Sequence, residues 1–484
     1  MKLADLLQGV TVYQATANMD TEITDVVYDS RKVTPGCLFV AITGFVSDGN
    51  RYIAKALESG AAAVVTAVQP QEEIPYVLVE SDRLALAQIG ANLYQKPAEA
   101  MKIIGITGTN GKTSATLLLK HILEVTQNAK VGLIGTMATI IGDVSVPAER
   151  TTPESLDLQA TFAKMRDAGC EYVIMEVSSH AIALERVGGV AFEVCAFTNL
   201  TEDHLDFHKT MENYCDTKAE LFARCKKSVF NRDDSWFNRI SQKATGPVLT
   251  TAVTADADLT AKQLQLKADG VEFTAIYQEK QAPVRLQIPG KFTVYNALTV
   301  LGIALQLGID LEQAAKALES AQGVKGRVEV VPTPGKPYTV LIDYAHTPDG
   351  LENVLSSVRG YCKGRLIAVF GCGGDRDPIK RPIMGKIGAD LADIAIITSD
   401  NPRTEEPMAI IEDIVKGIDK DNYKIIENRP AAIAYAMDIG EKDDIIVLAG
   451  KGHETYQEIC GVKYPLDERE IIAAHLEKMR NISG

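Results

Sequence analysis

The chain has 484 residues, 46% of them hydrophobic and 24% charged, which is enough for about three globular domains. Its formal net charge of -14 excludes the broad basic surface that nucleic-acid binding requires. No apolar run reaches the roughly 18 residues of a membrane-spanning helix, and the start, with Asp5, does not resemble a signal peptide. The eight scattered cysteines form no CxxC pair, so we expect a reduced, cytoplasmic protein without thiol-held metal.

The first domain is expected to span residues 1–98. Apolar runs at 38–42 and 61–68 predict strands, and the segment 51–60 predicts a helix that ends at Gly60. The polar Gln-Lys-Pro segment at 95–97 predicts the linker that follows.

A second domain is expected over 99–329. The β-branched run KIIGIT (102–107) predicts a strand, which a glycine-rich loop joins to an amphipathic helix over 114–125. Further strands are predicted at 172–177 and 194–200, and a long helix at 290–308. This alternation indicates an α/β fold with a mainly parallel sheet covered on both faces.

Residues 330–484 are expected to form a third domain. The runs TVLIDYA, RLIAVFGC, IAIITS and DIIVLAG predict buried strands, and helical stretches separate them. The pattern is typical of a doubly wound, Rossmann-like sheet.

The segment GITGTNGKT (105–113) is the sharpest local motif. Glycines allow backbone N–H groups to surround phosphate oxygens, and a helix N-terminus favours the anion. The strict P-loop pattern is not met, because Gly105 lies six residues before Gly111. A glycine-rich turn without a ligand remains the alternative. The predicted nucleotide contacts are Gly108, Thr109, Asn110, Gly111, Lys112, Thr113 and Ser114.

The loop GTNGKTS resembles the ATP loop of the Mur ligases and the folylpolyglutamate synthetases. Other blocks extend the resemblance to the Mur ligase that adds the third peptide residue, in the same order and spacing. They are RTTPES (150–155), MEVSSHAIALER (175–186), NLTEDHLDFH (199–208), YCDTKAELF (214–222), GKFTVYN (290–296), DYAHTPDGL (343–351), GCGGDRD (371–377), SDNPRTEEP (399–407) and GKGHE (450–454).

The resemblance implies an ATP-dependent acid–amino-acid ligase. Such an enzyme would add meso-2,6-diaminopimelate to the D-Glu of UDP-MurNAc-L-Ala-D-Glu through an acyl phosphate, giving ADP and phosphate. It would act in peptidoglycan synthesis, and so in cell-wall biogenesis, cell shape and the division cycle. The implied architecture is a uridine-binding domain, a central P-loop-type ATP-binding domain and a C-terminal amino-acid-binding domain. We expect a monomer without nucleic-acid binding or stable membrane association.

Four residues, Lys112, Glu176, His204 and Lys218, are expected to carry the chemistry. The loop pattern gives Lys112 to the β- and γ-phosphates and the Thr113 hydroxyl to Mg²⁺. The resemblance gives Glu176 and His204 to magnesium ions. It also implies that Lys218 becomes a carbamate, an anion that can ligate Mg²⁺. From the residues alone, Glu176 could be a helix cap or a surface carboxylate, and Lys218 would be a surface lysine.

The resemblance also assigns nucleotide contacts outside the loop. Asn296 of the YN pair and Arg327 of GR-E would contact ATP, and a planar guanidinium suits phosphate. Asp343 would accept hydrogen bonds from the ribose, although an Asp that follows a strand is equally a helix N-cap.

The resemblance places the acceptor substrate on two segments. The uridine would lie near Tyr28 and Ser30 and near Phe45, Val46 and Ser47, where FVSDG departs from the family's His-containing form. The muramoyl-peptide part would contact Thr151, Thr152, Ser178 and Arg186.

The C-terminal blocks are expected to select the incoming amino acid. A diaminodicarboxylate needs cationic groups for its carboxylates and acids or carbonyls for its ammonium groups. The predicted contacts are Arg376, Asp400, Asn401, Pro402, Arg403, Gly450 and Glu454. Family members that use lysine generally lack the Arg of DNPR, so Arg403 favours diaminopimelate as the incoming amino acid. The alternative is that Arg403 is a surface arginine in a turn.

Other hypotheses remain open at this point. L-Lysine could replace diaminopimelate, or the chain could be a folylpolyglutamate synthetase, although that family lacks the first domain. A P-loop kinase or motor ATPase would be expected to keep the strict loop pattern. A nucleotide-binding module without catalysis would not need Glu176, His204 and Lys218 together.

Overall fold

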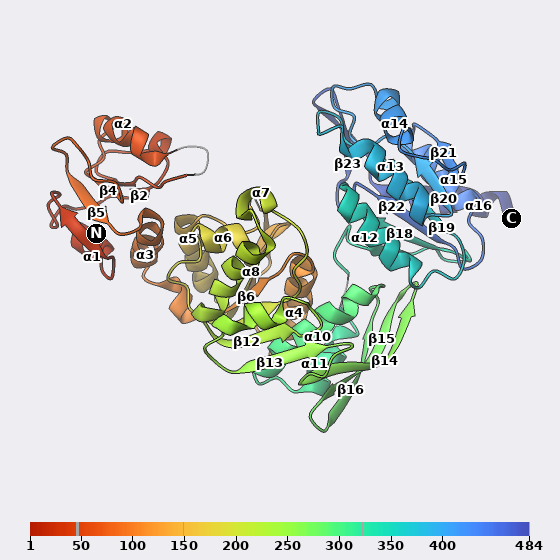
Figure 1. Ribbon diagram of the computed structural model, residues 1–484, viewed down its shortest axis with the longest axis horizontal. Coiled ribbons are helices and arrows are strands. Elements are labelled where there is room, and N and C mark those ends of the chain that lie inside the picture. Colours follow the sequence, from red (N-terminus) through yellow and green to blue (C-terminus); the bar gives the residue numbers. More distant parts are fainter. Residues whose placement is uncertain (45–47, 149, 322, 484) are drawn as a thin grey trace. The chain divides into compact units, whose positions relative to one another are not determined.

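The computed structural model describes residues 1–44, 48–148, 150–321 and 323–483. They form two compact units, one of Met1–Thr260 with Asn296–Ala314 and one of Ala261–Tyr295 with Ala315–Gly484 (Figure 1). In the described part of the chain, no helix combines the length and the apolar character needed to cross a bilayer. The domain boundaries at 98/99 and 329/330 stay predictions.

The first unit begins with a five-stranded sheet of order β1-β5-β4-β3-β2. Alternate side chains of β4 enter two different clusters, so both faces of this sheet are covered: Val64 packs with Ala56, and Val65 packs with Leu86. The strands are β1 (Val12–Ala15), β2 (Val26–Val27), β3 (Leu38–Val40), β4 (Ala63–Thr66) and β5 (Tyr76–Val79). The helices are α1 (Leu3–Leu6), α2 (Ile53–Glu58) and α3 (Asp82–Leu93), with 3₁₀ turns η1 (Ser30–Lys32), η2 (Gly49–Tyr52) and η3 (Pro97–Ala100).

The central sheet is parallel in its middle and has the order β16-β15-β14-β13-β12-β11-β6-β10-β7-β8-β9. Its strands β15 and β16 and most of β14 belong to the second unit. The chain moves from β6 first to β7 and β10 on one side and then to β11 on the other. Ligands collect beyond the carboxyl ends of strands at such a switch point. The strands are β6 (Lys102–Thr107), β7 (Val131–Ile134), β8 (Ala138–Ile141), β9 (Val144–Pro147), β10 (Tyr172–Glu176), β11 (Phe192–Phe197), β12 (Cys225–Asn231), β13 (Val248–Ala252) and β14 (Leu259–Lys267).

Helices cover the central sheet because its strands are apolar on both sides. Phe162 of α5 and Tyr214 of α8 pack with Val173 and Met175 of β10 in one buried cluster. The predicted parallel sheet is confirmed at its centre, whereas β7-β8-β9 pair antiparallel. The helices are α4 (Lys112–Gln127), α5 (Ser155–Asp167), α6 (Ser179–Ala183), α7 (Leu205–His208), α8 (Met211–Ala219), α9 (Phe237–Ile240), α10 (Lys291–Gln306) and α11 (Leu311–Leu318), with η4 (Glu220–Arg224) and η5 (Ser241–Lys243).

The second unit includes a segment that the sequence assigned to the central domain. Strands β15 (Gly270–Tyr277) and β16 (Lys280–Leu286) form an antiparallel pair. Leu266, Ala268 and Phe292 pack against the buried cluster on one face of the C-terminal sheet.

The C-terminal sheet has the order β17-β18-β22-β19-β20-β21, parallel except for β17. Ala368 of β19 packs with Leu351 and Met384 on one face, and Val369 packs with Ile472 on the other. Both faces are therefore covered, and the doubly wound prediction is confirmed (Figure 1). The strands are β17 (Glu329–Val331), β18 (Thr339–Asp343), β19 (Leu366–Phe370), β20 (Ile394–Ile397), β21 (Tyr423–Ile425) and β22 (Ile445–Ala449), with the hairpin β23 (Tyr456–Ile459) and β24 (Val462–Pro465). The helices are α12 (Pro348–Arg359), α13 (Lys380–Leu391), α14 (Pro407–Val415), α15 (Arg429–Asp438) and α16 (Glu468–Ser483).

Candidate active site

The predicted phosphate loop lies between β6 and the 16-residue helix α4, at the carboxyl edge of the central sheet. Gly108 has φ +151°, and a Cβ there would come within 1.9 Å of Thr198 Oγ1. A Cβ on Gly111 would come within 2.4 Å of Asn296 Oδ1, so Asn296 lies against the loop. Its contact with ATP stays a prediction. Glycines and a helix N-terminus at this place fit a phosphate group.

Glu176 ends β10 and is almost fully buried beside the loop. Its carboxylate accepts hydrogen bonds from Thr113 Oγ1 at 2.9 Å, Thr136 N at 3.0 Å and Thr136 Oγ1 at 3.1 Å. The ion pairs found among the described residues do not include Glu176. A buried carboxylate beside a hydroxyl, without a cationic partner, is a suitable oxygen ligand set for Mg²⁺.

Two lysines converge on one carbonyl of the loop. Lys112 Nζ donates to Gly108 O at 2.9 Å and to Thr109 O at 2.9 Å, and Lys218 Nζ donates to Gly108 O at 3.1 Å. Lys218 is buried on α8, with its ammonium 4.6 Å from the centre of the Tyr214 ring. Burial first, and then the neighbouring Lys112 charge, hold the pKa of Lys218 well below its usual range. Because Lys218 is buried, the surface-lysine alternative is wrong. Its surroundings disfavour the charged form of the amine.

His204 follows β11 with φ +53° and is exposed, with Nε2 3.3 Å from Asp203 Oδ2. Its ring lies edge-on to His180, at 4.8 Å between centroids. Burial, and then His180, lower the pKa of the neighbouring His208 to about 4. Within the described ranges, no three His, Cys, Asp or Glu side chains form a ready metal cluster.

The predicted muramoyl-peptide residues lie next to Glu176. Thr151 Oγ1 is 3.1 Å from Thr136 Oγ1, and Thr152 Oγ1 donates to the carbonyl of Glu176 at 2.8 Å. Ser178 caps α6 through Ala181 N at 3.2 Å, and its own N–H donates to Thr152 Oγ1 at 3.2 Å. The buried Thr152 hydroxyl is thus used within the protein, whereas Thr151 remains half-exposed beside it.

Arg186 forms an ion pair with Glu154, which is not among the site residues predicted from the sequence. Arg186 Nε lies 3.3 Å from Glu154 Oε2, and its NH1 donates to Thr152 O at 3.2 Å. Arg83 and Arg150 also lie within 3.4 Å and 3.6 Å of the same carboxylate. Three guanidinium groups around one carboxylate leave a net positive charge, which suits an anionic substrate.

The predicted uridine contacts lie in the first sheet domain. The Tyr28 hydroxyl donates to Asp157 Oδ2 at 2.5 Å, and burial and this carboxylate raise the pKa of Tyr28. Ser30 begins the 3₁₀ turn η1. Phe45, Val46 and Ser47 lie outside the described residues.

In the second unit, Arg327 and Asp343 occupy neighbouring segments. The Arg327 guanidinium lies 5.3 Å from the centre of the Tyr344 ring. Asp343 ends β18 and accepts hydrogen bonds from Val328 N at 2.8 Å and Ala345 N at 2.8 Å. Burial raises the pKa of this carboxyl. One oxygen of Asp343 thus holds the backbone next to Arg327, and the other holds the backbone next to Tyr344. Val328, the neighbour of Arg327, has a strained φ of +43°.

The predicted amino-acid contacts come together in one cavity. It has a volume of about 330 Å³ and lies at the carboxyl ends of β18, β19, β20 and β22, where four separate segments meet. Six of the seven predicted contacts line it, together with five residues that the sequence reading passed over. The predicted ones are Arg376, Asp400, Asn401, Arg403, Gly450 and Glu454, and the others are Tyr344, His346, Thr347, Gly373 and Lys380. Pro402 is not in the lining.

Arg403, the predicted selectivity residue, is half-buried in the cavity wall. Its NH1 donates to Gly374 O at 2.7 Å, and its Nε lies 3.3 Å from Glu458 Oε2 on β23. Arg403 therefore has partners before any ligand arrives. Three cationic lining residues, Arg376, Lys380 and Arg403, face two acidic ones, Asp400 and Glu454.

The chain matches known proteins over almost its whole length. Three family models match the chain: "Mur ligase family, catalytic domain" over residues 22–103, "Mur ligase middle domain" over 106–304, and "Mur ligase, glutamate ligase domain" over 326–452. The chain is 48% identical to a UDP-N-acetylmuramoyl-L-alanyl-D-glutamate–2,6-diaminopimelate ligase of Clostridium acetobutylicum, over 99% of this chain and 100% of the relative. The chain belongs to the Mur ligase family.

Other relatives extend this membership of the Mur ligase family. A ligase of the same description from Clostridium botulinum is 49% identical over 93% of this chain and 94% of its own. A solved structure of a UDP-N-acetylmuramoyl-L-alanyl-D-glutamate–2,6-diaminopimelate ligase matches with a TM-score of 0.77 and 30% identity, over 99% of both chains. The predicted three-domain Mur ligase architecture is thereby confirmed.

The Mur ligase loop makes a direct prediction for Lys112. Lys112→Ala is expected to lower kcat by about 10²–10³, because it removes a positive charge from the loop that is expected to hold the transferred phosphate. The measurement is ATP-dependent release of phosphate under saturating substrates. Lys120→Ala, which removes a lysine paired with Glu124 on the same helix, is the matched control and should keep normal turnover. Near-normal turnover of the Lys112 variant would exclude the assigned role.

Proposed function

We propose that this chain forms an amide bond between the D-Glu carboxylate of UDP-MurNAc-L-Ala-D-Glu and an amino group of meso-2,6-diaminopimelate, at the expense of ATP. The product serves peptidoglycan synthesis. The observation that carries the proposal is the C-terminal cavity, where Arg376 and Arg403 stand with Asp400 and Glu454. A diaminodicarboxylate carries both kinds of charge, and each finds a complementary partner there.

ATP fits the central site by the shape and charge of the loop. Gly108 and Gly111 leave room where a Cβ would collide, and α4 presents its N-terminus and Lys112. Asn296, whose Oδ1 lies beside Gly111, is a further nucleotide contact in this proposal.

Magnesium fits the same site through the oxygen atoms of Glu176 and Thr113, which lie 2.9 Å apart. His204 and Lys218, as a carbamate, are the further ligands in this proposal. A bound magnesium ion would neutralise phosphate charge during the transfer. The N–H and the hydroxyl of Thr136 both donate to the Glu176 carboxylate and hold it in place for that role.

The reaction balances in two steps. An oxygen of the D-Glu carboxylate attacks the γ-phosphorus of ATP, and the bond to ADP breaks, which leaves an acyl phosphate. The nitrogen of the amino acid then attacks the acyl carbon, inorganic phosphate leaves, and the nitrogen gives up a proton. Lys112 and the loop amides stabilise charge on the transferred group, and the cavity orients the amine.

L-Lysine is the second candidate for the incoming amino acid. The ion pair between Arg403 and Glu458 favours lysine, because Arg403 would keep a partner when the bound amino acid has no second carboxylate. The other charges of the cavity favour diaminopimelate, because Arg376 and Lys380 line it as well.

A product assay tests the proposal directly. The chain is offered ATP, Mg²⁺, UDP-MurNAc-L-Ala-D-Glu and one amino acid at a time, and the products are identified by mass. We expect one diaminopimelate residue to be added, with ADP and phosphate formed in equal amounts. Product with lysine alone would move the assignment to the second candidate, and ATP hydrolysis without any ligation would exclude both.

A further inference from the structure

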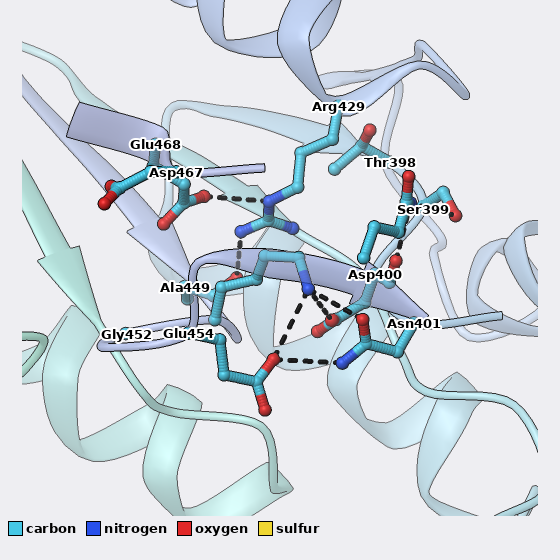
Figure 2. A network of polar contacts seen from close by, with 12 residues as sticks. Thr398, Ser399, Asp400, Asn401, Arg429, Ala449, Gly452, Glu454, Asp467 and Glu468 are labelled. Carbon is cyan, nitrogen blue, oxygen red and sulfur yellow. Dashed lines mark hydrogen bonds and ion pairs between the residues drawn. The ribbon is translucent and has the colours of Figure 1, made fainter. Parts of the chain in front are cut away.

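A fully buried lysine lies directly beneath the amino-acid cavity. Lys451 follows Gly450 at the carboxyl end of β22, and its side chain has no exposed surface. Its neighbours in the GKGHE motif, Gly450 and Glu454, line the cavity, whereas Lys451 does not. Figure 2 shows the side chains of Asp400, Asn401 and Glu454, which form the acidic wall, turned toward a common point.

The three N–H donors of Lys451 meet three acceptors. Lys451 Nζ lies 2.8 Å from Asn401 Oδ1, 3.3 Å from Asp400 Oδ1 and 3.4 Å from Glu454 Oε2. All three acceptors belong to residues that line the cavity. An ammonium group has three donors and no acceptor, so this set satisfies it completely.

Lys451 also determines which way the Asn401 amide points. Asn401 Oδ1 accepts from Lys451 and from Glu458 N at 2.9 Å, which leaves Nδ2 to donate to Glu454 Oε2 at 3.0 Å. With the amide reversed, Nδ2 would face the ammonium group and a backbone N–H, and the Glu454 carboxylate would face an oxygen. The buried cation therefore fixes both Asn401 and Glu454.

The same cation balances charge in the wall. Asp400 and Glu454 are two carboxylates close to one ammonium group, and Asp400 is packed against Gly450, where a Cβ would come within 2.6 Å of Asp400 Oδ2. The next buried cation, Arg429, is engaged elsewhere, with Glu468 at 2.8 Å and Ala449 O at 2.8 Å. Without Lys451, the two carboxylates would repel each other and rotate toward water.

We propose that Lys451 is a positioning residue that holds Asp400, Asn401 and Glu454 in the arrangement that receives the incoming amino acid. The inference rests on the proposed function, because it assumes that this cavity binds the amino acid. All three hydrogen-bond partners of Lys451 line the cavity, so its loss is expected to affect the amino acid and to leave the nucleotide and the UDP-linked substrate unaffected.

The test is steady-state kinetics of the full chain with each substrate varied in turn. Lys451→Met keeps the length of the side chain and removes its donors. Hydrogen bonds to charged groups are worth enough for a change of about 10- to 100-fold. We therefore expect the KM for diaminopimelate to rise at least about tenfold, with the KM for ATP and for UDP-MurNAc-L-Ala-D-Glu within about twofold. Equal KM values for all three substrates in variant and wild type would overturn the proposal.

Asp444→Asn is the matched control, because Asp444 is a buried charge at the opposite end of β22, paired with Arg365 at 2.7 Å. It should lower the melting temperature while leaving all three KM values unchanged. If this control raised the KM for diaminopimelate as Lys451→Met does, the effect would be one of stability and the proposal would fail.

A second comparison covers the case in which Lys451→Met does not fold. Lys451→Met combined with Glu454→Gln removes the cation together with one of its carboxylates, so less unpaired charge remains. This double variant should still have a KM for diaminopimelate about tenfold above that of Glu454→Gln alone, because Asn401 and Asp400 are released. An equal KM overturns the proposal. Absence of ligation by the wild type would instead contradict the proposed function itself.

Discussion

Lys218→Ala is expected to abolish ligation, and formate or acetate is expected to restore part of it. Lys218 and Lys112 donate to the same carbonyl, Gly108 O, at 3.1 Å and 2.9 Å. Two ammonium groups so close repel each other, and burial adds to the cost of a charge on Lys218. A neutral amine can add CO₂ and release a proton, which yields a carbamate. This anion would relieve the repulsion and provide a magnesium ligand.

The rescue separates this role from simple packing. A small carboxylate can occupy the space that the shortened side chain leaves, and it carries the same charge as a carbamate. The measurement is turnover of the Lys218 variant against formate concentration, with chloride at equal ionic strength for comparison. Lys226→Ala, which removes an exposed lysine paired with Glu193, should retain full turnover without added carboxylate. An intact-mass measurement of active enzyme that finds only bare lysine would argue against the carbamate.

Arg403→Ala is expected to remove most activity with diaminopimelate and much of the preference over lysine. Lysine lacks one terminal carboxylate, and losing one partner of a buried charge pair costs about 2–5 kcal/mol, or roughly 30- to several-thousand-fold. The existing contacts of Arg403 with Glu458 and Gly374 O reduce the penalty that lysine suffers in the wild type. We therefore expect a preference in the lower half of that range.

The measurement is kcat/KM for both amino acids, in wild type and variant. Arg376 and Lys380 line the same cavity and are expected to keep some selectivity in the single variant. Arg359→Ala removes a half-buried arginine paired with Asp393, away from the cavity lining, and serves as the control, with an unchanged ratio. If Arg403→Ala left the ratio of the two kcat/KM values as it was, selection would reside elsewhere in the cavity.

The site could be predicted from the sequence where its residues follow strands. Arg376 and Asp400 come after β19 and β20, and Gly450 comes after β22. Parallel strands end at one edge of a sheet, so residues far apart in the chain meet there. The same rule placed Glu176, at the end of β10, beside the phosphate loop that follows β6.

Other features depend on packing that sequence patterns do not contain. Lys218 lies on a short helix whose burial is decided by the neighbouring loop, and nothing in its local sequence distinguishes it from a surface lysine. The DYAHTPD motif was used for Asp343 alone, yet Tyr344, His346 and Thr347 line the cavity. Antiparallel pairs such as β15 and β16 were missed because strand formation depends strongly on partners.

The segment of residues 261–295 has a practical consequence for dividing the chain. Leu266, Ala268 and Phe292 cover part of the apolar core beneath the C-terminal sheet. A recombinant fragment that starts at the expected boundary, residue 330, would lose this cover and present the apolar side chains to water. Exposed apolar patches favour self-association. A stable C-terminal fragment therefore needs residues 261–295 as well, although the rest of α10 and all of α11 separate this segment from residue 330 in sequence.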